Sequence, residues 1–181
     1  TRTPRRALRP GMVVESWIEG VGPIRHGCTC QRRGSTVPMS SVPNIPLNNG
    51  VDIPQLGFGV FQIPPSETVD ATLAALEVGY RHIDTAEMYG NEAGVGEAIR
   101  DCGLHRDAVW ITSKLDNDKH EPDAIRGAFA ETLQKLGVEQ IDLFLIHWPQ
   151  PGREDFVTRW KVLEEFKADG RARSIGVSNF E

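Results

Sequence analysis

Cysteine is scarce in this 181-residue chain. The three present, Cys28, Cys30 and Cys102, are too few for a disulfide framework, and their spacing lacks the paired CxxC ligands of a zinc site. We interpret Cys28 and Cys30 as free thiols, and Cys102 as a packing residue near the end of a helix. The sequence therefore predicts no metal centre.

Long apolar runs and a basic excess are absent as well. No segment approaches the roughly 18 to 20 apolar residues that span a bilayer, and no signal-peptide core follows the first basic residues. With a formal net charge of -5, the chain gives no reason to expect the clustered basic face that binds a phosphate backbone. These absences predict a cytoplasmic protein that binds neither membrane nor nucleic acid.

The charge is unevenly distributed along the chain. Residues 1–38 hold seven Arg, no Lys and two Glu, a net charge of +5, which leaves -10 for the remainder. Residues 1–40 show neither helical nor strand periodicity and are rich in Arg, Gly and Pro, so we expect a disordered extension. This extension makes no clean amphipathic helix of the transit-peptide kind. We hypothesise that Met39 is the natural start.

Residues 41–181 follow a regular pattern. Two short segments, 45–48 and 51–53, flank an Asn49-Gly50 pair and predict a β-hairpin. After it, a short apolar strand, a polar loop and an amphipathic helix closed by glycine recur in succession. We expect strands at 56–59, 80–84, 109–112, 141–146 and 174–177, and four helices: one capped by Ser66 and ending at Gly79, one capped by Asn91 and ending at Gly103, one at 122–136 and one at 156–168.

Strands that alternate with helices are parallel and are joined by right-handed crossovers. Two architectures fit this pattern, an open doubly wound sheet or part of a (β/α)8 barrel. The GxGxxG expected after the first strand of a dinucleotide-binding open sheet is missing, because Val60-Phe61-Gln62 follows Gly57-Phe58-Gly59. We therefore predict an α/β fold, an incomplete TIM barrel of about five strands and four helices behind the hairpin, since a full barrel needs roughly 250 residues.

Polar side chains follow each expected strand at its C-terminal end. In a barrel these ends converge on the face that carries the active site. A glycosidase would present two carboxylates there, whereas one acid, one lysine, one histidine and one tyrosine suit proton transfer to a carbonyl oxygen. The residues concerned are Asp84, Tyr89, Lys114, His147, Ser178 and Asn179.

Five motifs at these positions resemble the successive signatures of aldo/keto reductases. The resemblance covers about residue 43 to the end and is strongest for the prokaryotic branch that contains 2,5-diketo-D-gluconate reductases. Because the motifs occur in order at barrel-like spacing, the match is specific. The motifs are GYRHIDTA at 79–86, YGNE at 89–92, TSKL at 112–115, DLFLIHWP at 142–149 and SIGVSNF at 174–180.

The resemblance implies NADPH-dependent reduction of an aldehyde or ketone, a small-molecule carbonyl substrate. Tyr89 would be the general acid that protonates the carbonyl oxygen. Lys114 would stabilise the resulting phenolate, and Asp84 would keep Lys114 charged and oriented. His147 would hydrogen-bond the substrate oxygen. The parent protein is expected to be a monomer.

The resemblance also implies a cofactor site and a substrate pocket. Ser178 and Asn179 would hold the nicotinamide carboxamide beside Asp84, while the region that separates NADPH from NADH lies in the last three units of the barrel, beyond Glu181. Phe61 and Trp148 would line the substrate pocket together with His147. Many relatives carry a tryptophan at the position of Asp116, so this carboxylate favours a polar or cationic substrate.

Each assignment has a structural alternative, and so does the chain. A buried ion pair, core side chains, a turn and packing aromatics explain the same residues without any chemistry. His82, two positions before Asp84 on the same strand, is interpreted as structural. The chain itself could be a non-catalytic half barrel, a truncated product or interaction module, or a cofactor-binding regulatory subunit. The intact set of four argues against loss of catalysis.

Overall fold

The structure, a computed structural model, describes residues 13–18, 22–27, 43–150, 152 and 156–180. The chain divides into two units, Thr1–Met39 and Ser40–Glu181. In the first unit, strands β1 (Val13–Ile18) and β2 (Gly22–Gly27) pair in antiparallel fashion. The sequence did not predict this pair. The expectation of disorder elsewhere in residues 1–40, and the positions of Cys28, Cys30 and Met39, lie outside the described residues.

The second unit begins with the expected hairpin. Strand β3 (Asn44–Pro46) pairs with β4 (Asp52–Pro54) in antiparallel fashion. The turn between them closes with a hydrogen bond from Gly50 N to Leu47 O, and Gly50 takes a φ of +78° that favours glycine. The side-chain amide of Asn49 donates to Arg173 O at 3.1 Å and Ser174 Oγ at 3.0 Å. The hairpin is therefore held at the start of the last strand, β9 (Ala172–Val177).

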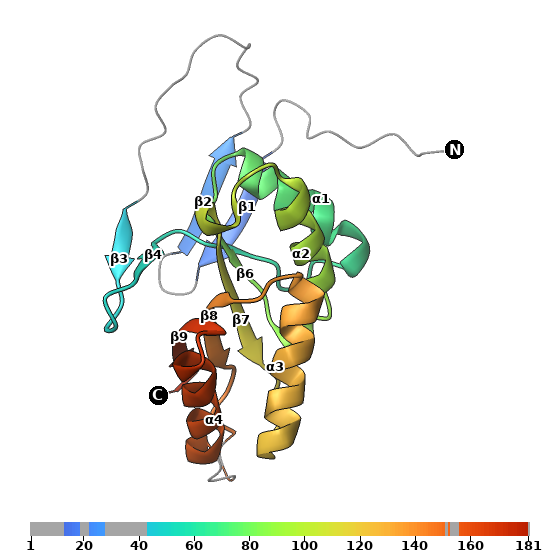
Figure 1. Cartoon of the computed structure of the whole chain (residues 1–181). Helices are drawn as coiled ribbons and strands as arrows, with labels where there is room; N and C mark the ends of the chain where they lie inside the picture. The colour runs from blue at the N-terminus through green and yellow to red at the C-terminus, as the bar shows by residue number, and fades with distance from the viewer. Residues whose placement is uncertain (1–12, 19–21, 28–42, 151, 153–155, 181) are drawn as a thin grey trace. The chain divides into compact units, whose positions relative to one another are not determined.

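Five parallel strands form the sheet of the second unit in the order β5-β6-β7-β8-β9, so each strand pairs with the next along the chain. Helices α1 to α4 lie between successive strands, and α3 and α4 lie side by side (Figure 1). This is the α/β arrangement of a partial barrel that the sequence predicted. The further bounds are β5 (Phe58–Gly59), α1 (Pro65–Glu77), β6 (His82–Asp84), α2 (Glu92–Asp101), β7 (Trp110–Leu115), α3 (Pro122–Leu136), β8 (Ile141–Ile146) and α4 (Phe156–Ala168).

Of the two predicted helix caps, Ser66 is wrong, whereas Asn91 does occupy the N-cap position of its helix. Helix α1 begins at Pro65 after an N-cap at Pro64, and Ser66 makes no capping bond. A proline in the first turn explains this start, because its fixed φ suits a helix and it has no N–H to satisfy. Asn91 does precede α2, but its side chain forms no cap bond either, since other partners occupy it. The two helices end at Glu77 and Asp101, and their C-caps, Val78 and Cys102, are each followed by the expected glycine.

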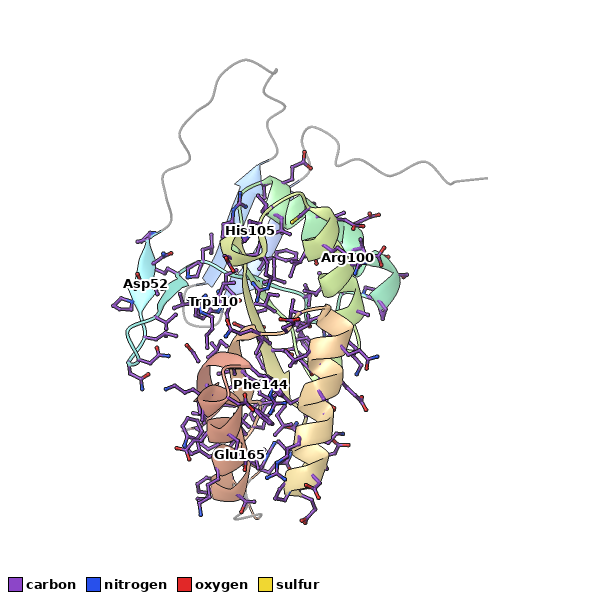
Figure 2. The ribbon with its side chains drawn as sticks, viewed as in Figure 1. Asp52, Arg100, His105, Trp110, Phe144 and Glu165 are labelled. Atoms are coloured by element: carbon purple, nitrogen blue, oxygen red, sulfur yellow. The ribbon has the colours of Figure 1, made fainter. Side chains whose placement is uncertain are left out.

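The helix-covered face of the sheet carries the hydrophobic core. Phe144 of β8 points toward α3 and α4 (Figure 2), where its ring centroid lies 4.7 Å from that of Phe129. Phe129 stacks on Phe166 of α4 with centroids 4.0 Å apart and an interplanar angle of 9°. All three rings are fully buried. Burying such rings contributes several kcal/mol and fixes both helices on this face.

Helices α2 and α3 approach each other closely at Gly96. A Cβ added there would lie 2.5 Å from the backbone oxygen of Leu136, so only glycine fits. The buried carboxylate of Glu92 joins the same layer, accepting a 2.6 Å hydrogen bond from Ser113 of β7 and a 3.4 Å one from Thr132 of α3. Burial raises the pKa of Glu92.

In the part of the chain that the structure describes, none of the helices has both the length and the apolar character needed to span a membrane.

The opposite face of the sheet carries polar side chains on β6 and β7. Residues two apart on a strand share a face, which places Trp110, Thr112 and Lys114 of β7 beside His82 and Asp84 of β6. On β8, Phe144 and Ile146 of the helix face are buried, whereas Leu143 and Leu145 of the opposite face are only half-buried. Ionisable side chains therefore gather on the face away from the helices, toward the C-terminal strand ends.

Candidate active site

Lys114 is the centre of the polar cluster. Its ammonium Nζ lies 2.6 Å from Asp84 Oδ1, donates to Thr85 O at 3.0 Å and reaches Tyr89 Oη at 3.5 Å. The Lys114 side chain is 8% exposed and that of Asp84 is 32% exposed. A buried ammonium needs an ion pair and further acceptors, and this one has both. Adjacent strands β6 and β7 therefore bring the predicted acid and lysine together.

Tyr89 lies between two other predicted residues. It ends a short 3-10 helix, η1 (Glu87–Tyr89), and Gly90 follows in the left-handed region with a φ of +68°. Its ring lies 5.0 Å from the ring of Phe61 and 5.7 Å from that of His147, the latter in an edge-on arrangement. The Lys114 ammonium lies 5.1 Å from the centre of the same ring. Tyr89, Lys114, Asp84 and His147 thus form one contiguous cluster.

His147 follows β8 and is 6% exposed. Burial lowers the pKa of His147 below its ordinary 6.5, and the charge of Lys114 lowers it further, while Asp116 and Asp84 oppose this shift. The imidazole is therefore neutral at neutral pH and carries a single N–H. Its Nδ1 is buried without a hydrogen-bond partner among the described residues. This nitrogen is therefore an unpaired polar atom in the interior of the cluster.

Ser178 and Asn179 follow β9 and are tied to the same strand end. Ser178 N donates to Ile146 O at 2.9 Å. The Asn179 amide donates to His147 O at 2.8 Å and to Ser178 Oγ at 3.0 Å, and Asn179 takes a left-handed φ of +60°. Ser178 and Asn179 are therefore bonded to the backbone of Ile146 and His147.

The three predicted pocket residues other than His147 lie at the rim of the cluster. Phe61 and Trp148 are 62% and 47% exposed. Asp116 is half-buried, and its Oδ1 accepts a hydrogen bond from Asn117 N at 2.5 Å. Glu87 Oε2 accepts from Asp116 N at 3.0 Å, so the loop after β7 is anchored to η1. The exposed ring of Phe61 therefore lies beside Tyr89 at the edge of the buried cluster.

His82 lies two residues before Asp84 on β6 and contacts groups outside the cluster. Its Nε2 lies 2.9 Å from Thr112 Oγ1 and its Nδ1 lies 3.3 Å from Pro54 O, and burial lowers its pKa. Both ring nitrogens have structural partners, which agrees with its interpretation as a structural residue.

Sequence reasoning missed three contributors to the site. Thr85 acts through its backbone carbonyl, which no residue type reveals. Glu87 was not singled out. Asn91 was assigned to a helix cap, although its place in the YGNE motif directly after Tyr89 was a signal of proximity to the site.

A cavity of about 460 Å³ lies at the other end of the strands. Its charged groups include Arg106 and Arg173, which both pair with Asp142 at 2.7 and 2.8 Å. Of the residues that the structure describes, three Arg and three Asp or Glu side chains line the cavity and no Lys, His or Tyr does, so it lacks the reactive set of the cluster at Lys114. No group of three or more His, Cys, Asp or Glu side chains suited to a metal ion occurs among the described residues.

Comparison with known proteins identifies the family. The family model described as "Aldo/keto reductase family" matches residues 55–181. The chain belongs to the aldo/keto reductase family. A curated aldo-keto reductase from Mycobacterium sp. (strain KMS) is 50% identical over 139 residues, which cover 77% of this chain and 50% of that protein. The chain spans about half the length of the curated aldo/keto reductases it matches.

Solved aldo/keto reductase structures share the fold. The Bombyx mori aldo-keto reductase in complex with NADP is 39% identical with a TM-score of 0.72, covering 77% of this chain and 51% of that one. A putative 2,5-diketo-D-gluconic acid reductase B is 42% identical with a TM-score of 0.69, covering 74% of this chain and 47% of that one. The resemblance seen in the motifs is thereby confirmed, and the sheet β5 to β9 is part of an aldo/keto reductase barrel.

Proposed function

We propose that this chain carries the catalytic half of a reductase that converts aldehydes and ketones to alcohols with NADPH. The observation that carries the proposal is the position of the Lys114 ammonium, 2.6 Å from Asp84 Oδ1 and 3.5 Å from Tyr89 Oη. Family membership supports it. NADPH, when bound, supplies a hydride to the carbonyl carbon.

Tyr89 donates the proton in this proposal. A phenol is a weak acid at neutral pH, so loss of its proton to a carbonyl oxygen requires stabilisation of the phenolate. The Lys114 ammonium supplies this stabilisation from 3.5 Å, in a buried site where charges interact strongly. Asp84 and the carbonyl of Thr85 hold the ammonium in place. Removal of Asp84 would leave a buried positive charge without its partner.

His147 orients the substrate. Its pKa is lowered by burial and by the charge of Lys114, so at neutral pH it offers one N–H donor without adding a second positive charge beside the ammonium. Its ring meets that of Tyr89 edge-on at 5.7 Å. A carbonyl oxygen that accepts a hydrogen bond from the imidazole therefore lies within reach of the tyrosine proton.

Ser178 and Asn179 fit the amide end of a nicotinamide. Because Ser178 Oγ accepts from Asn179 Nδ2, its own proton is available to a carbonyl oxygen. Asn179 Oδ1 accepts no hydrogen bond from the described residues and is available to an amide N–H. A carboxamide has one acceptor and one donor group, so this pair would hold it beside Asp84. NADPH is favoured by a relative solved with NADP, and NADH remains an alternative cofactor.

The substrate class that we propose is polar or cationic. Asp116 stands half-buried at the rim of the cluster, and its charge acts on His147 in the direction that raises the histidine pKa. A carboxylate at the rim of the site attracts cationic substrates and repels anionic ones. Phe61 and Trp148 supply apolar contact at the same rim. Comparison of KM for a cationic and an anionic aldehyde, before and after Asp116→Asn, tests this preference.

The proposed activity is tested with the two tyrosines of the chain. Tyr89→Phe removes the acid and keeps the ring, and it should lower NADPH oxidation with a reactive aldehyde or diketone by about a hundredfold or more in the full-length protein. Tyr80→Phe is the matched control, because Tyr80 packs edge-on against Phe58 and lies two residues before β6. Equal activity of both variants would contradict the role of Tyr89.

The competing hypothesis is a half barrel without catalytic activity, which acts as an interaction module. It predicts neither nicotinamide binding nor NADPH oxidation for residues 1–181 alone. The proposed function predicts NADPH oxidation by the full-length protein that Tyr89→Phe lowers.

A further inference from the structure

Asn91 is buried and forms three side-chain hydrogen bonds that the chemistry above does not use. Its Nδ2 donates to Val60 O at 2.9 Å and to Ile63 O at 3.1 Å, and its Oδ1 accepts from Thr85 Oγ1 at 3.0 Å. The side chain is 1% exposed. The amide nitrogen and the amide oxygen of Asn91 therefore both have partners, and loss of these hydrogen bonds in a buried site is costly.

The two carbonyls that Asn91 holds are the ends of a single tight turn. Ile63 N donates to Val60 O at 3.1 Å across residues 60–63. Within this turn Gln62 takes a φ of +63°, a left-handed conformation that a non-glycine residue adopts only at a cost. A strained turn needs contacts that enforce its shape. Asn91 provides two such contacts, although it lies 28 and 31 residues away along the chain.

The turn carries Phe61, the most exposed ring of the site. Phe61 lies between the two clamped carbonyls and its ring rests 5.0 Å from that of Tyr89, at an interplanar angle of 50°. Asn91 itself follows Tyr89 by two residues. One buried amide therefore connects the segment of the proposed acid with the turn that places an aromatic ring beside it.

Thr85 connects the same amide to the ammonium. Its hydroxyl donates to Asn91 Oδ1, while its backbone carbonyl accepts from Lys114 Nζ. The backbone of Thr85 is also fixed to β7, because Thr85 N donates to Thr112 O at 2.9 Å. Asn91 is thus bonded through Thr85 to the sheet on one side and holds the turn 60–63 on the other.

We propose that Asn91 is a positioning residue that fixes Phe61 beside Tyr89 and thereby determines how tightly the carbonyl substrate is held. This inference rests on the proposed reductase function for its kinetic consequence, but its structural part stands without it. Asn91 acts through the turn 60–63 and touches neither substrate nor the reacting atoms.

Amide hydrogen exchange tests the structural part without any assay of activity. In Asn91→Ala, the Ile63 amide should exchange about tenfold faster, because the turn it closes has lost its two external donors. Asn49→Ala is a matched control, since Asn49 also donates two side-chain hydrogen bonds, to Arg173 O and Ser174 Oγ, at the other end of the strands. Unchanged Ile63 exchange in Asn91→Ala, or an equal change in Asn49→Ala, would overturn the proposal.

Steady-state kinetics test the specificity part. With benzaldehyde, Asn91→Ala should raise KM about tenfold and change kcat by no more than about twofold, since ground-state placement and not proton transfer is affected. The same substitution in a Phe61→Ala background should have little further effect on KM, because the ring that the turn positions is gone. A tenfold fall in kcat in Asn91→Ala, or additive effects of the two substitutions on KM, would contradict the assignment.

The unmodified protein gives a test that does not depend on folding of a variant. If Asn91 holds the turn, its side-chain NH2 protons should exchange slowly and show nuclear Overhauser effects to residues of the turn. Rapid exchange of these protons overturns the proposal. If instead the protein lacks reductase activity while these signals are present, the proposed function fails and the positioning role of Asn91 survives.

Discussion

Lys114 Nζ and Asp84 Oδ1 lie 2.6 Å apart, on strands that are neighbours in the sheet. The strand register pairs Asp84 with Thr112, two residues before Lys114 and on the same face. The long lysine side chain spans this offset, so its ammonium meets the carboxylate beside Tyr89. The ion pair is therefore a product of the β6–β7 register, and a shift of one residue would separate its members.

Loss of the Asp84 charge should impair proton transfer. Asp84→Asn keeps the shape of the side chain but leaves the Lys114 ammonium without its counter-ion, so the ammonium is less well held beside Tyr89. We expect kcat to fall by roughly tenfold to a hundredfold. Steady-state kinetics of the full-length protein measure this, with Asp70→Asn on the exposed side of α1 as the control. An unchanged kcat would argue for a purely structural ion pair.

The carboxylate of Asp116 should act on the titration of His147. The histidine pKa is lowered by burial and then by Lys114, and Asp116 partly opposes this. Asp116→Asn removes the opposing charge, so the His147 pKa should fall further. Observation of the imidazole signals by NMR over a pH series measures the change, and Asp118→Asn, an exposed position two residues away, is the control. A rise in the pKa would contradict this prediction.

Glu92 should make stability decline as the pH rises. Burial raises its folded-state pKa above the ordinary 4.5, so the folded protein keeps the proton when the unfolded chain has released it. The contribution to stability is therefore complete below pH 4.5 and is lost as the pH rises through the folded-state pKa. Glu92→Gln removes this dependence while keeping an oxygen for Ser113.

Urea unfolding between pH 4 and 7 measures the effect. The free energy of unfolding of the Glu92→Gln variant should decline less with pH than that of the unmodified protein. Glu97→Gln, an exposed position on the same helix, should leave the slope unchanged. Parallel curves for all three proteins would contradict the assignment to Glu92.

Two glycines in helices should respond to alanine in opposite directions. At Gly96 a Cβ would meet Leu136 O at 2.5 Å and Lys135 O at 2.7 Å, so α2 and α3 would have to separate. We expect Gly96→Ala to destabilise the protein by about 2 kcal/mol or more. At Gly127 of α3 nothing lies within 4 Å of the added atom, and Gly127→Ala should stabilise by about 0.5 to 1 kcal/mol. Thermal unfolding measures both.

Regular elements were predictable from local pattern alone. The bounds of α3, α4 and β8 were confirmed as predicted, because apolar periodicity, a proline at the start of α3 and a glycine after Leu136 all act within a few residues. The cluster of Asp84, Lys114 and His147 was predictable as a set because parallel strands end on one face.

Contacts made by amides and carbonyls were not predictable in this way. A sequence pattern for a helix cap and for a tertiary clamp is the same, an asparagine before a helix, so the sequence placed Asn91 correctly at the N-cap but could not name the partners of its side chain. Two of these partners, Val60 O and Ile63 O, lie in the segment between β5 and α1. The β1–β2 pair was missed for a related reason, since its strands lack the alternation on which strand prediction depends.

The sequential order of the sheet bears on how the protein is made. Because β5 to β9 pair strictly with their predecessors along the chain, the Asp84–Lys114 contact can form once residue 114 has left the ribosome, and His147 joins when the next strand arrives. Each step closes a loop of only one β/α unit, which keeps its entropic cost low. We expect the reactive cluster to assemble during synthesis, before translation of the whole chain ends.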